Sequence, residues 1–136
     1  MQILSKENQC FEQELHVEIT EKIETSLYVQ AQEKCTQAYD EQQGLTADFC
    51  QKIGHRMMLV EQKSEVKQLK LCQSHLRVKT WVTHVTPMFV FRMTVIFYPD
   101  TQQPVWLSQT KWACVEVQTG YPKRLSPTFL NAFSQS

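Results

Sequence analysis

Three carboxylates stand close together near the start of the sequence. Glu18, Glu21 and Glu24 lie between a segment with the periodicity of a strand and a segment with the periodicity of a helix. A carboxylate beside a helix N-terminus can activate water or attack an acyl carbonyl, while the free backbone N–H groups stabilise the negative charge that develops. Each glutamate taken singly is equally explained as a solvated charge. Their shared position favours the chemical interpretation.

A second candidate group lies near the other end of the chain. Lys123 and Arg124 follow the segment Thr119–Pro122. Because a guanidinium can bind phosphate through two hydrogen bonds, a contact with a nucleotide phosphate is one interpretation of Arg124. A solvated turn is the simpler one, since two adjacent charges are a weak signal.

The other reactive residues form no recognisable motif. The four histidines never stand three or four residues apart, and the five cysteines contain no CxxC pair, so we predict no metal site. Cys35 would act as a nucleophile only with a histidine held beside it. The three glycines permit neither GxGxxG nor GxxxxGK[ST], which argues against a glycine-rich phosphate loop. We predict no cofactor.

Hydrophobic periodicity predicts the elements that position the glutamates. Leu15, Val17 and Ile19 alternate with polar residues, which is typical of a half-buried strand. A helix is predicted over Ser26–Gln43, with Thr25 or Ser26 as its N-cap and Gly44 after its end. Its apolar stripe consists of Leu27, Ala31, Cys35, Ala38 and Tyr39.

The rest of the chain favours an antiparallel sheet. A short helix is predicted over Thr46–Ile53, and alternating segments then follow, with turns at His84–Met88 and Tyr98–Pro104. Consecutive strands without crossover helices indicate an α+β fold with a five-stranded antiparallel sheet. We expect a single domain over residues 1–136 with its core in 10–127. One helix cannot cover both faces of such a sheet, so we expect a second subunit to cover part of the apolar remainder, including Trp81, Trp106 and Trp112.

Composition excludes several other classes of protein. The chain has 136 residues, 42% of them hydrophobic, and its 14 basic and 14 acidic residues give zero net charge. These values are typical of a folded domain, and they give no overall attraction to nucleic acid or to an anionic membrane. No apolar run approaches the length of about 20 residues that spans a bilayer. With no signal-peptide pattern and five scattered cysteines, we expect a cytoplasmic protein.

Several segments together resemble one known family. Tyr28–Glu33 is similar to the first turns of its central helix, and Leu76–Val82 and Phe89–Met93 to its third and fourth strands. Thr110–Val115 and Thr119–Leu125 are similar to its last strand and its TG-x-P-x-R ending. This family is the hotdog-fold thioesterases of the 4-hydroxybenzoyl-CoA and acyl-CoA thioesterase type. The resemblance extends from about Glu14 to Pro127.

The resemblance implies a long helix wrapped by an antiparallel sheet, in dimers that share a continuous sheet and often pair into tetramers. It implies active sites at the dimer interface that hydrolyse acyl-CoA or acyl-carrier-protein thioesters without a metal. In the family an Asp at the end of the first strand is the base or nucleophile. Here, counting from Leu15 places Glu21 at that position, and counting back from Tyr28 places Glu18 there.

The sequence therefore predicts a hotdog-fold acyl thioesterase that acts on acyl-CoA or an acyl-carrier protein. Two other interpretations stay open, namely a hotdog module that binds an acyl carrier without catalysis, and a cone-shaped cyclase or isomerase fold. In the thioesterase interpretation Glu21, or else Glu18, is the catalytic carboxylate. The resemblance implies that the substrate is held by Ser26, Leu27, Tyr28 and Arg124.

Overall fold

A computed structural model describes residues 10–19 and 25–133 of the chain. The three helices are α1 (Thr25–Gln42), α2 (Ala47–Ile53) and α3 (Pro127–Phe133). The strands are β1 (Phe11–His16), β2 (His55–Val66), β3 (His75–Val85), β4 (Phe89–Phe97), β5 (Pro104–Glu116) and β6 (Pro122–Lys123).

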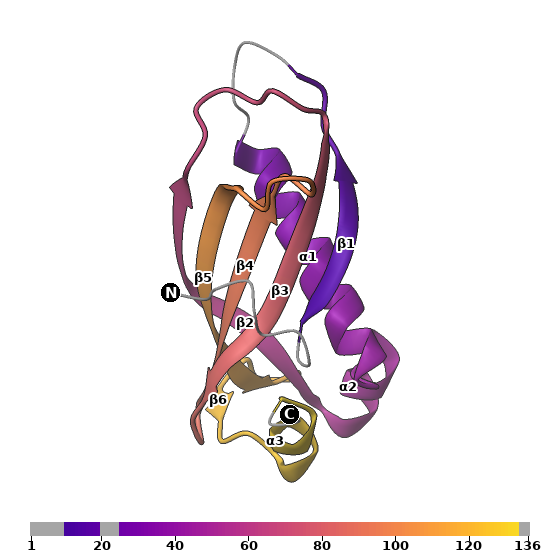
Figure 1. Cartoon of the computed structure of the whole chain (residues 1–136). Helices are drawn as coiled ribbons and strands as arrows, with labels where there is room; N and C mark the ends of the chain where they lie inside the picture. The colour runs from indigo at the N-terminus through magenta and orange to yellow at the C-terminus, as the bar shows by residue number, and fades with distance from the viewer. Residues whose placement is uncertain (1–9, 20–24, 134–136) are drawn as a thin grey trace.

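The long strands form one curved sheet that wraps around α1 (Figure 1). Their order is β1-β3-β4-β5-β2, and every neighbouring pair is antiparallel. The short strand β6 pairs with β5. The predicted α+β architecture, a long helix against five antiparallel strands, is confirmed.

Local hydrogen bonds explain why the predicted short helix and turns form. The Thr46 hydroxyl caps α2 by accepting from the Phe49 N–H at 3.1 Å, and Gly54 ends the helix with a φ of 76°. The Tyr98 N–H donates to the Gln103 carbonyl at 3.0 Å across the turn between β4 and β5. Both features agree with the sequence prediction.

The first strand begins and ends earlier than predicted. β1 covers residues 11–16, so Val17 and Ile19 lie beyond it. The Val17 N–H donates to the Ser74 carbonyl at 2.8 Å, whereas the Ile19 side chain is 50% exposed. The alternation of apolar residues continues beyond the residues that pair with β3, so it predicted the wrong bounds for this strand.

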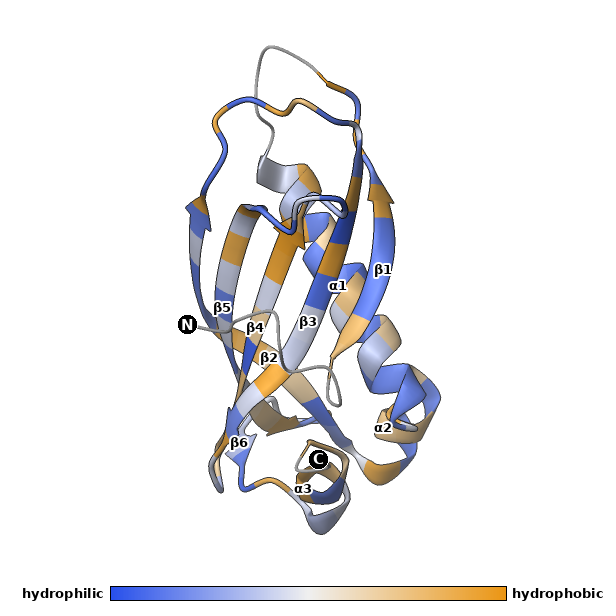
Figure 2. Ribbon diagram, viewed as in Figure 1, coloured by the Kyte–Doolittle hydropathy of each residue, from blue (hydrophilic) through white to orange (hydrophobic). Residues whose placement is uncertain are grey.

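The buried face of α1 is also rotated from the predicted one. Leu27 is exposed, and Thr25 and Ser26 lie within the first turn rather than at the N-cap. The predicted stripe is confirmed for Ala31, Cys35 and Tyr39 and wrong for Leu27 and Ala38. It counted only apolar residues, whereas the buried face also includes two polar ones. The buried residues of α1 are Tyr28, Ala31, Gln32, Cys35, Thr36 and Tyr39. Figure 2 shows hydrophilic and hydrophobic residues mixed along this helix.

Two of the three tryptophans named with the expected second subunit are buried within this chain, and the second subunit itself stays a prediction. Trp106 is buried against Tyr28, with ring centroids 5.8 Å apart. Trp81 is buried on the opposite face of the sheet, in a cluster with Met93, Val95 and Phe97. Only Trp112 stays partly exposed. A single chain thus supplies packing on both faces of its sheet.

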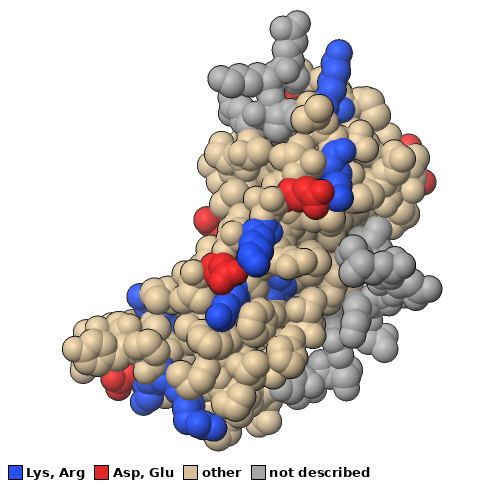
Figure 3. All heavy atoms as spheres, turned by 90° about the vertical axis from the view of Figure 1, so that its left-hand side faces the viewer, with Lys and Arg blue, Asp and Glu red and all other residues tan. Residues whose placement is uncertain are grey.

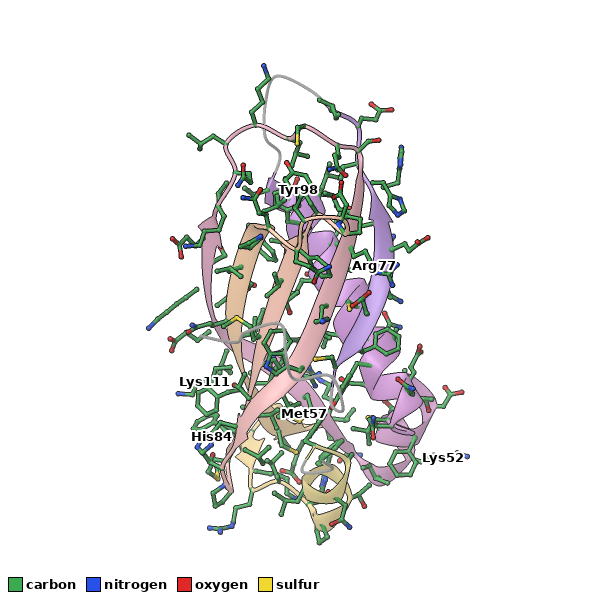
Figure 4. All side chains as sticks on the ribbon, viewed as in Figure 1. Lys52, Met57, Arg77, His84, Tyr98 and Lys111 are labelled. Carbon is green, nitrogen blue, oxygen red and sulfur yellow. The ribbon has the colours of Figure 1, made fainter. Side chains whose placement is uncertain are left out.

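One end of the face away from α1 carries a basic and aromatic group. The Lys111 ammonium lies 4.2 Å from the centroid of the Phe89 ring, and the His84 and Phe91 rings are 5.7 Å apart. Lys111 and His84 project from the lower left of the molecule in Figure 4. These contacts are cation–π and ring contacts at the surface.

The C-terminal helix α3 was not predicted. Its first turn is held by the Ser126 carbonyl, which accepts from the Leu130 N–H at 2.9 Å. Phe129 and Phe133 stack with centroids 6.1 Å apart and are buried against Tyr39, Val82 and Val90. Seven residues are too few for a periodic pattern to stand out, so tertiary packing decides this helix.

Replacing Leu76 tests the core beneath α1. This side chain is fully buried on β3, so Leu76→Ala should lower the free energy of unfolding by about 2–5 kcal/mol. Leu69 is 84% exposed, and Leu69→Ala should change that free energy by less than about 0.5 kcal/mol. Urea unfolding followed by tryptophan fluorescence compares the two. Equal losses would contradict the assigned core.

Candidate functional site

The predicted catalytic carboxylates lie at the junction between β1 and α1. Glu18 is in the short segment that follows β1, and its side chain is exposed. Glu21 lies outside the described residues. The described structure therefore includes only one of the two candidates, and the choice between them stays a prediction.

The predicted oxyanion donors are at the start of α1, as the sequence indicated. Ser26 and Leu27 lie in the first helical turn with exposed side chains. Backbone N–H groups in a first turn lack partners within the helix, so they are available to a negatively charged oxygen. The Tyr28 ring is buried against Trp106, so the predicted role of this residue rests on its backbone alone. Burial also raises the pKa of the Tyr28 hydroxyl.

Arg124 lies far from this junction within one chain. It follows β6 and is exposed. Figure 1 shows β6 at the lower end of the molecule, while the first turn of α1 is at the upper end. A single chain does not bring Arg124 and Glu18 together, so a shared site would have to combine two chains.

Cys35 cannot serve as a nucleophile. It is completely buried, and its thiol lies 3.7 Å from the Phe11 carbonyl oxygen and 3.9 Å from that of Val78. Burial raises the pKa of the Cys35 thiol to about 12. A thiolate is the reactive form, so this side chain is a packing residue.

The structure shows a buried polar layer between α1 and the sheet, which the sequence analysis missed. Two hydrogen bonds define it. The Gln32 amide nitrogen donates to the Gln62 side-chain oxygen at 3.1 Å, and the Thr80 and Thr94 hydroxyls lie 3.1 Å apart. The buried members of the polar layer are Gln32, Thr36, Thr80, Arg92, Thr94, Ser108 and Thr110.

A buried ion pair lies at one end of the polar layer. The Arg92 guanidinium donates to an Asp40 oxygen at 2.8 Å, and the Arg92 side chain is only 1% exposed. Three rings surround the guanidinium, with centroids 5.0–5.5 Å from its central carbon: Tyr39, Trp112 and Phe133. Burial raises the pKa of the Asp40 carboxyl above its ordinary value, although the nearby Arg92 charge opposes the rise.

Several polar atoms in this layer are buried without a hydrogen-bond partner in the described structure. They are the Gln32 side-chain oxygen, the Ser108 hydroxyl and two of the Arg92 guanidinium nitrogens, Nε and Nη1. Leaving a polar group buried and unpaired costs about 1–3 kcal/mol. The group contains both donors and an acceptor.

A cleft of about 400 Å³ opens beside the polar layer, between α1 and the β2 side of the sheet. Thr36 and Asp40 line it on the side of α1, and Met57 and Trp112 line it on the side of the sheet. The remaining walls come from α2, from the end of β5 and from Phe129 on α3. Half of the residues that line the cleft are polar or charged, among them Glu33, Glu41 and Arg56.

The described residues, 10–19 and 25–133, contain neither a cluster of metal ligands nor a membrane-spanning helix. No three His, Cys, Asp or Glu side chains gather there to hold a metal ion. No helix in this part of the chain is long and apolar enough to cross a membrane.

Known structures share this fold. A protein titled as an oleoyl thioesterase from Lactobacillus plantarum matches with a TM-score of 0.83 and 12% identity, over 94% of this chain and 52% of that one. A 1,4-dihydroxy-2-naphthoyl-CoA thioesterase from Synechocystis matches with a TM-score of 0.76 and 14% identity, over 92% and 96%. A Staphylococcus aureus protein in complex with CoA matches with a TM-score of 0.81 and 9% identity, over 93% of this chain and 82% of that one.

These similarities establish the fold. The chain spans about half of the Lactobacillus protein but nearly all of the Synechocystis enzyme. No family sequence model matches the chain, and no curated protein sequence does. The chain has the hotdog fold of these thioesterase structures, at identities too low to carry their activities over.

Removing Asp40 tests the buried ion pair. Asp40→Ala leaves the Arg92 charge buried and unpaired, so the free energy of unfolding should fall by about 3–5 kcal/mol. Glu61→Ala is the control, because the Glu61–Lys63 pair, at 3.6 Å, is solvent-exposed and should contribute less than about 1 kcal/mol. Denaturant unfolding measures both. Asp40→Ala combined with Arg92→Met should recover part of the loss, and a double variant less stable than Asp40→Ala would contradict the pairing.

Proposed function

We propose that this protein hydrolyses an acyl thioester carried by CoA or by an acyl-carrier protein. The observation that carries the proposal is the first turn of α1, which in the sequence follows a short segment that bears Glu18 and Glu21. The hotdog fold supports it, because the Synechocystis protein with this fold is a CoA thioesterase. The Staphylococcus protein in complex with CoA supports CoA as the carrier.

The proposed reaction needs only a base and an oxyanion site. Glu21 or Glu18 takes a proton from water, and the oxygen of that water attacks the thioester carbonyl carbon. The backbone N–H groups at Ser26–Tyr28 stabilise the oxyanion that forms. The carbon–sulfur bond then breaks, and the thiolate leaves and takes up a proton. Direct attack by the carboxylate, followed by hydrolysis of the anhydride, is the other route.

The proposed site is completed by a second copy of the chain. Within the described residues β2 pairs only with β5, so its outer edge is free. Met58, Leu59 and Val60 on this strand are 36–44% exposed. A free edge of twelve residues that carries these exposed apolar side chains favours pairing with another β2 strand. The occupant we propose is a second copy, which gives a continuous sheet.

Charge on the β2 side supports that pairing. Glu61, Lys63, Glu65 and Lys67 alternate in sign, and Figure 3 shows acidic and basic side chains following one another on this side of the molecule. In an antiparallel pair, a two-fold axis at Gln62 or Ser64 sets a glutamate opposite a lysine. The partner then runs in the reverse direction, so its Arg124 lies at the same end as the first turn of α1, where it is proposed to meet the nucleotide arm.

A hotdog module that binds an acyl carrier without turnover is the second candidate. It is favoured by the exposed position of Glu18, since catalytic carboxylates usually lie in a protected site. Binding of acyl-CoA without release of thiol would identify this alternative.

Replacing the two glutamates tests the mechanism. Glu18→Gln and Glu21→Gln are compared for thiol release from short-chain, long-chain and aromatic acyl-CoAs. The variant at the true base should lose about 10²–10⁴-fold in kcat, because a general base contributes that much. Glu14→Gln, on the exposed side of β1, is the control and should retain activity. Full activity in both test variants would refute the mechanism.

Replacing an edge residue tests the second copy. Leu59→Glu buries a charge at the proposed strand pairing, so the protein should shift from dimer to monomer and lose hydrolysis with it. Leu69→Glu adds the same charge at a position that is 84% exposed, so it should change neither the oligomeric state nor the rate of hydrolysis. Sedimentation velocity gives the oligomeric state. A dimer or tetramer that survives Leu59→Glu would show that β2 is not the interface.

A further inference from the structure

A second hollow, the outer hollow, lies on the face of the sheet away from α1. Its volume is about 350 Å³. Phe91 and Met93 on β4 border it, and they stand directly opposite Lys111 and Gln109 on β5, which border it too. The side chain of Arg92, between Phe91 and Met93, contacts α1. Because successive side chains of a strand point to opposite faces, the sheet separates the outer hollow from the cleft beside α1.

The outer hollow carries one unbalanced positive charge. Glu61 and Lys63 on β2 border it, and their charged atoms pair with each other at 3.6 Å. Lys111 makes no ion pair with a described residue. Its ammonium lies 4.2 Å from the centroid of the Phe89 ring and 5.8 Å from that of the Phe91 ring (Figure 4). An ammonium has three hydrogen-bond donors and a ring face offers them no oxygen, so this half-buried charge favours an anionic ligand.

Gln109 supplies a second donor beside Lys111. The two residues are two positions apart on β5, so their side chains emerge on the same face about 7 Å from each other. The Gln109 side chain is exposed, and its amide nitrogen can donate two hydrogen bonds. Both side chains are long enough to converge on the two oxygens of one carboxylate.

An apolar surface adjoins these two donors. Phe91 is half-buried and Met93 is buried, and the Phe89 ring meets the Phe91 ring edge to face with centroids 6.4 Å apart. Aromatic rings pack well against phenylalanine rings and methionine sulfur. A water molecule in the liquid occupies about 30 Å³, so this volume has room for about a dozen non-hydrogen atoms. An aromatic carboxylate of one or two rings has this size and a single negative charge.

We propose that the outer hollow is a binding site for an aromatic carboxylate. Its carboxylate bonds to Lys111 and Gln109, and its ring lies over Phe91 and Met93. This site goes beyond the proposed function, because it shares no residue with the start of α1 or with the cleft. The proposed second copy pairs through the edge of β2, which leaves the outer face open.

The test measures binding of 2-naphthoate to the full chain by calorimetry. The uncharged analogue 2-naphthamide should bind about tenfold more weakly, the effect of losing a hydrogen bond between charged groups. Lys111→Met should weaken binding of 2-naphthoate by a similar factor and leave binding of 2-naphthamide unchanged. Lys70→Met is the matched control, because Lys70 is exposed and does not border the outer hollow. Urea unfolding verifies that both variants are folded.

Amide chemical shifts of the ¹⁵N-labelled protein locate the bound probe. Shifts at Phe91, Gln109 and Lys111 support the proposed site, whereas shifts confined to Thr36 and Asp40 would place 2-naphthoate in the cleft and overturn it. Equal binding of the acid and the amide, or of Lys111→Met and the unaltered protein, also overturns it. So does an absence of binding, the result expected if another copy of the chain covers this face. None of these measurements depends on thiol release, so the proposed hydrolysis is tested separately.

Discussion

The structure depends on how one helix covers one face of a curved antiparallel sheet. α1 packs mainly against β3 and β1, so the other side of the inner face, formed by β5 and β2, has no long helix over it. The space that remains is the cleft beside α1, closed at its lower end by α2 and α3. The outer edge of β2 has no partner in the described chain either, because this strand ends the sheet.

The interior beneath α1 combines apolar packing with a costly polar layer. The core around Tyr28, Leu76 and Trp106 supplies the usual hydrophobic stabilisation. Beside it, the Arg92–Asp40 pair is held in a ring of aromatic side chains, and replacing such a pair by apolar residues is often neutral or stabilising. Unpaired buried atoms add further cost. Stability alone therefore does not explain this arrangement.

The two ends of α1 border different parts of the molecule. Its first turn follows, in the sequence, the segment that bears Glu18 and Glu21, and its second half borders the cleft and the ion pair. Arg124, at the opposite end of the molecule, can join only from a second copy.

Periodicity in the sequence determined the order of elements, because alternation and the helical stripe record which side of each segment is buried. The short helix before Gly54 and the turn at 98–104 followed from capping and turn chemistry, which are local. The polar layer could not be predicted, since Gln32 and Thr36 on a helix are ordinarily solvated and only the sheet opposite them makes them buried. Likewise nothing near Arg92 in the sequence points to Asp40, 52 residues away. Caps and turns depend on residues that are neighbours in the sequence and can be predicted from it. Burial and long-range pairing depend on residues that meet only once the chain has folded.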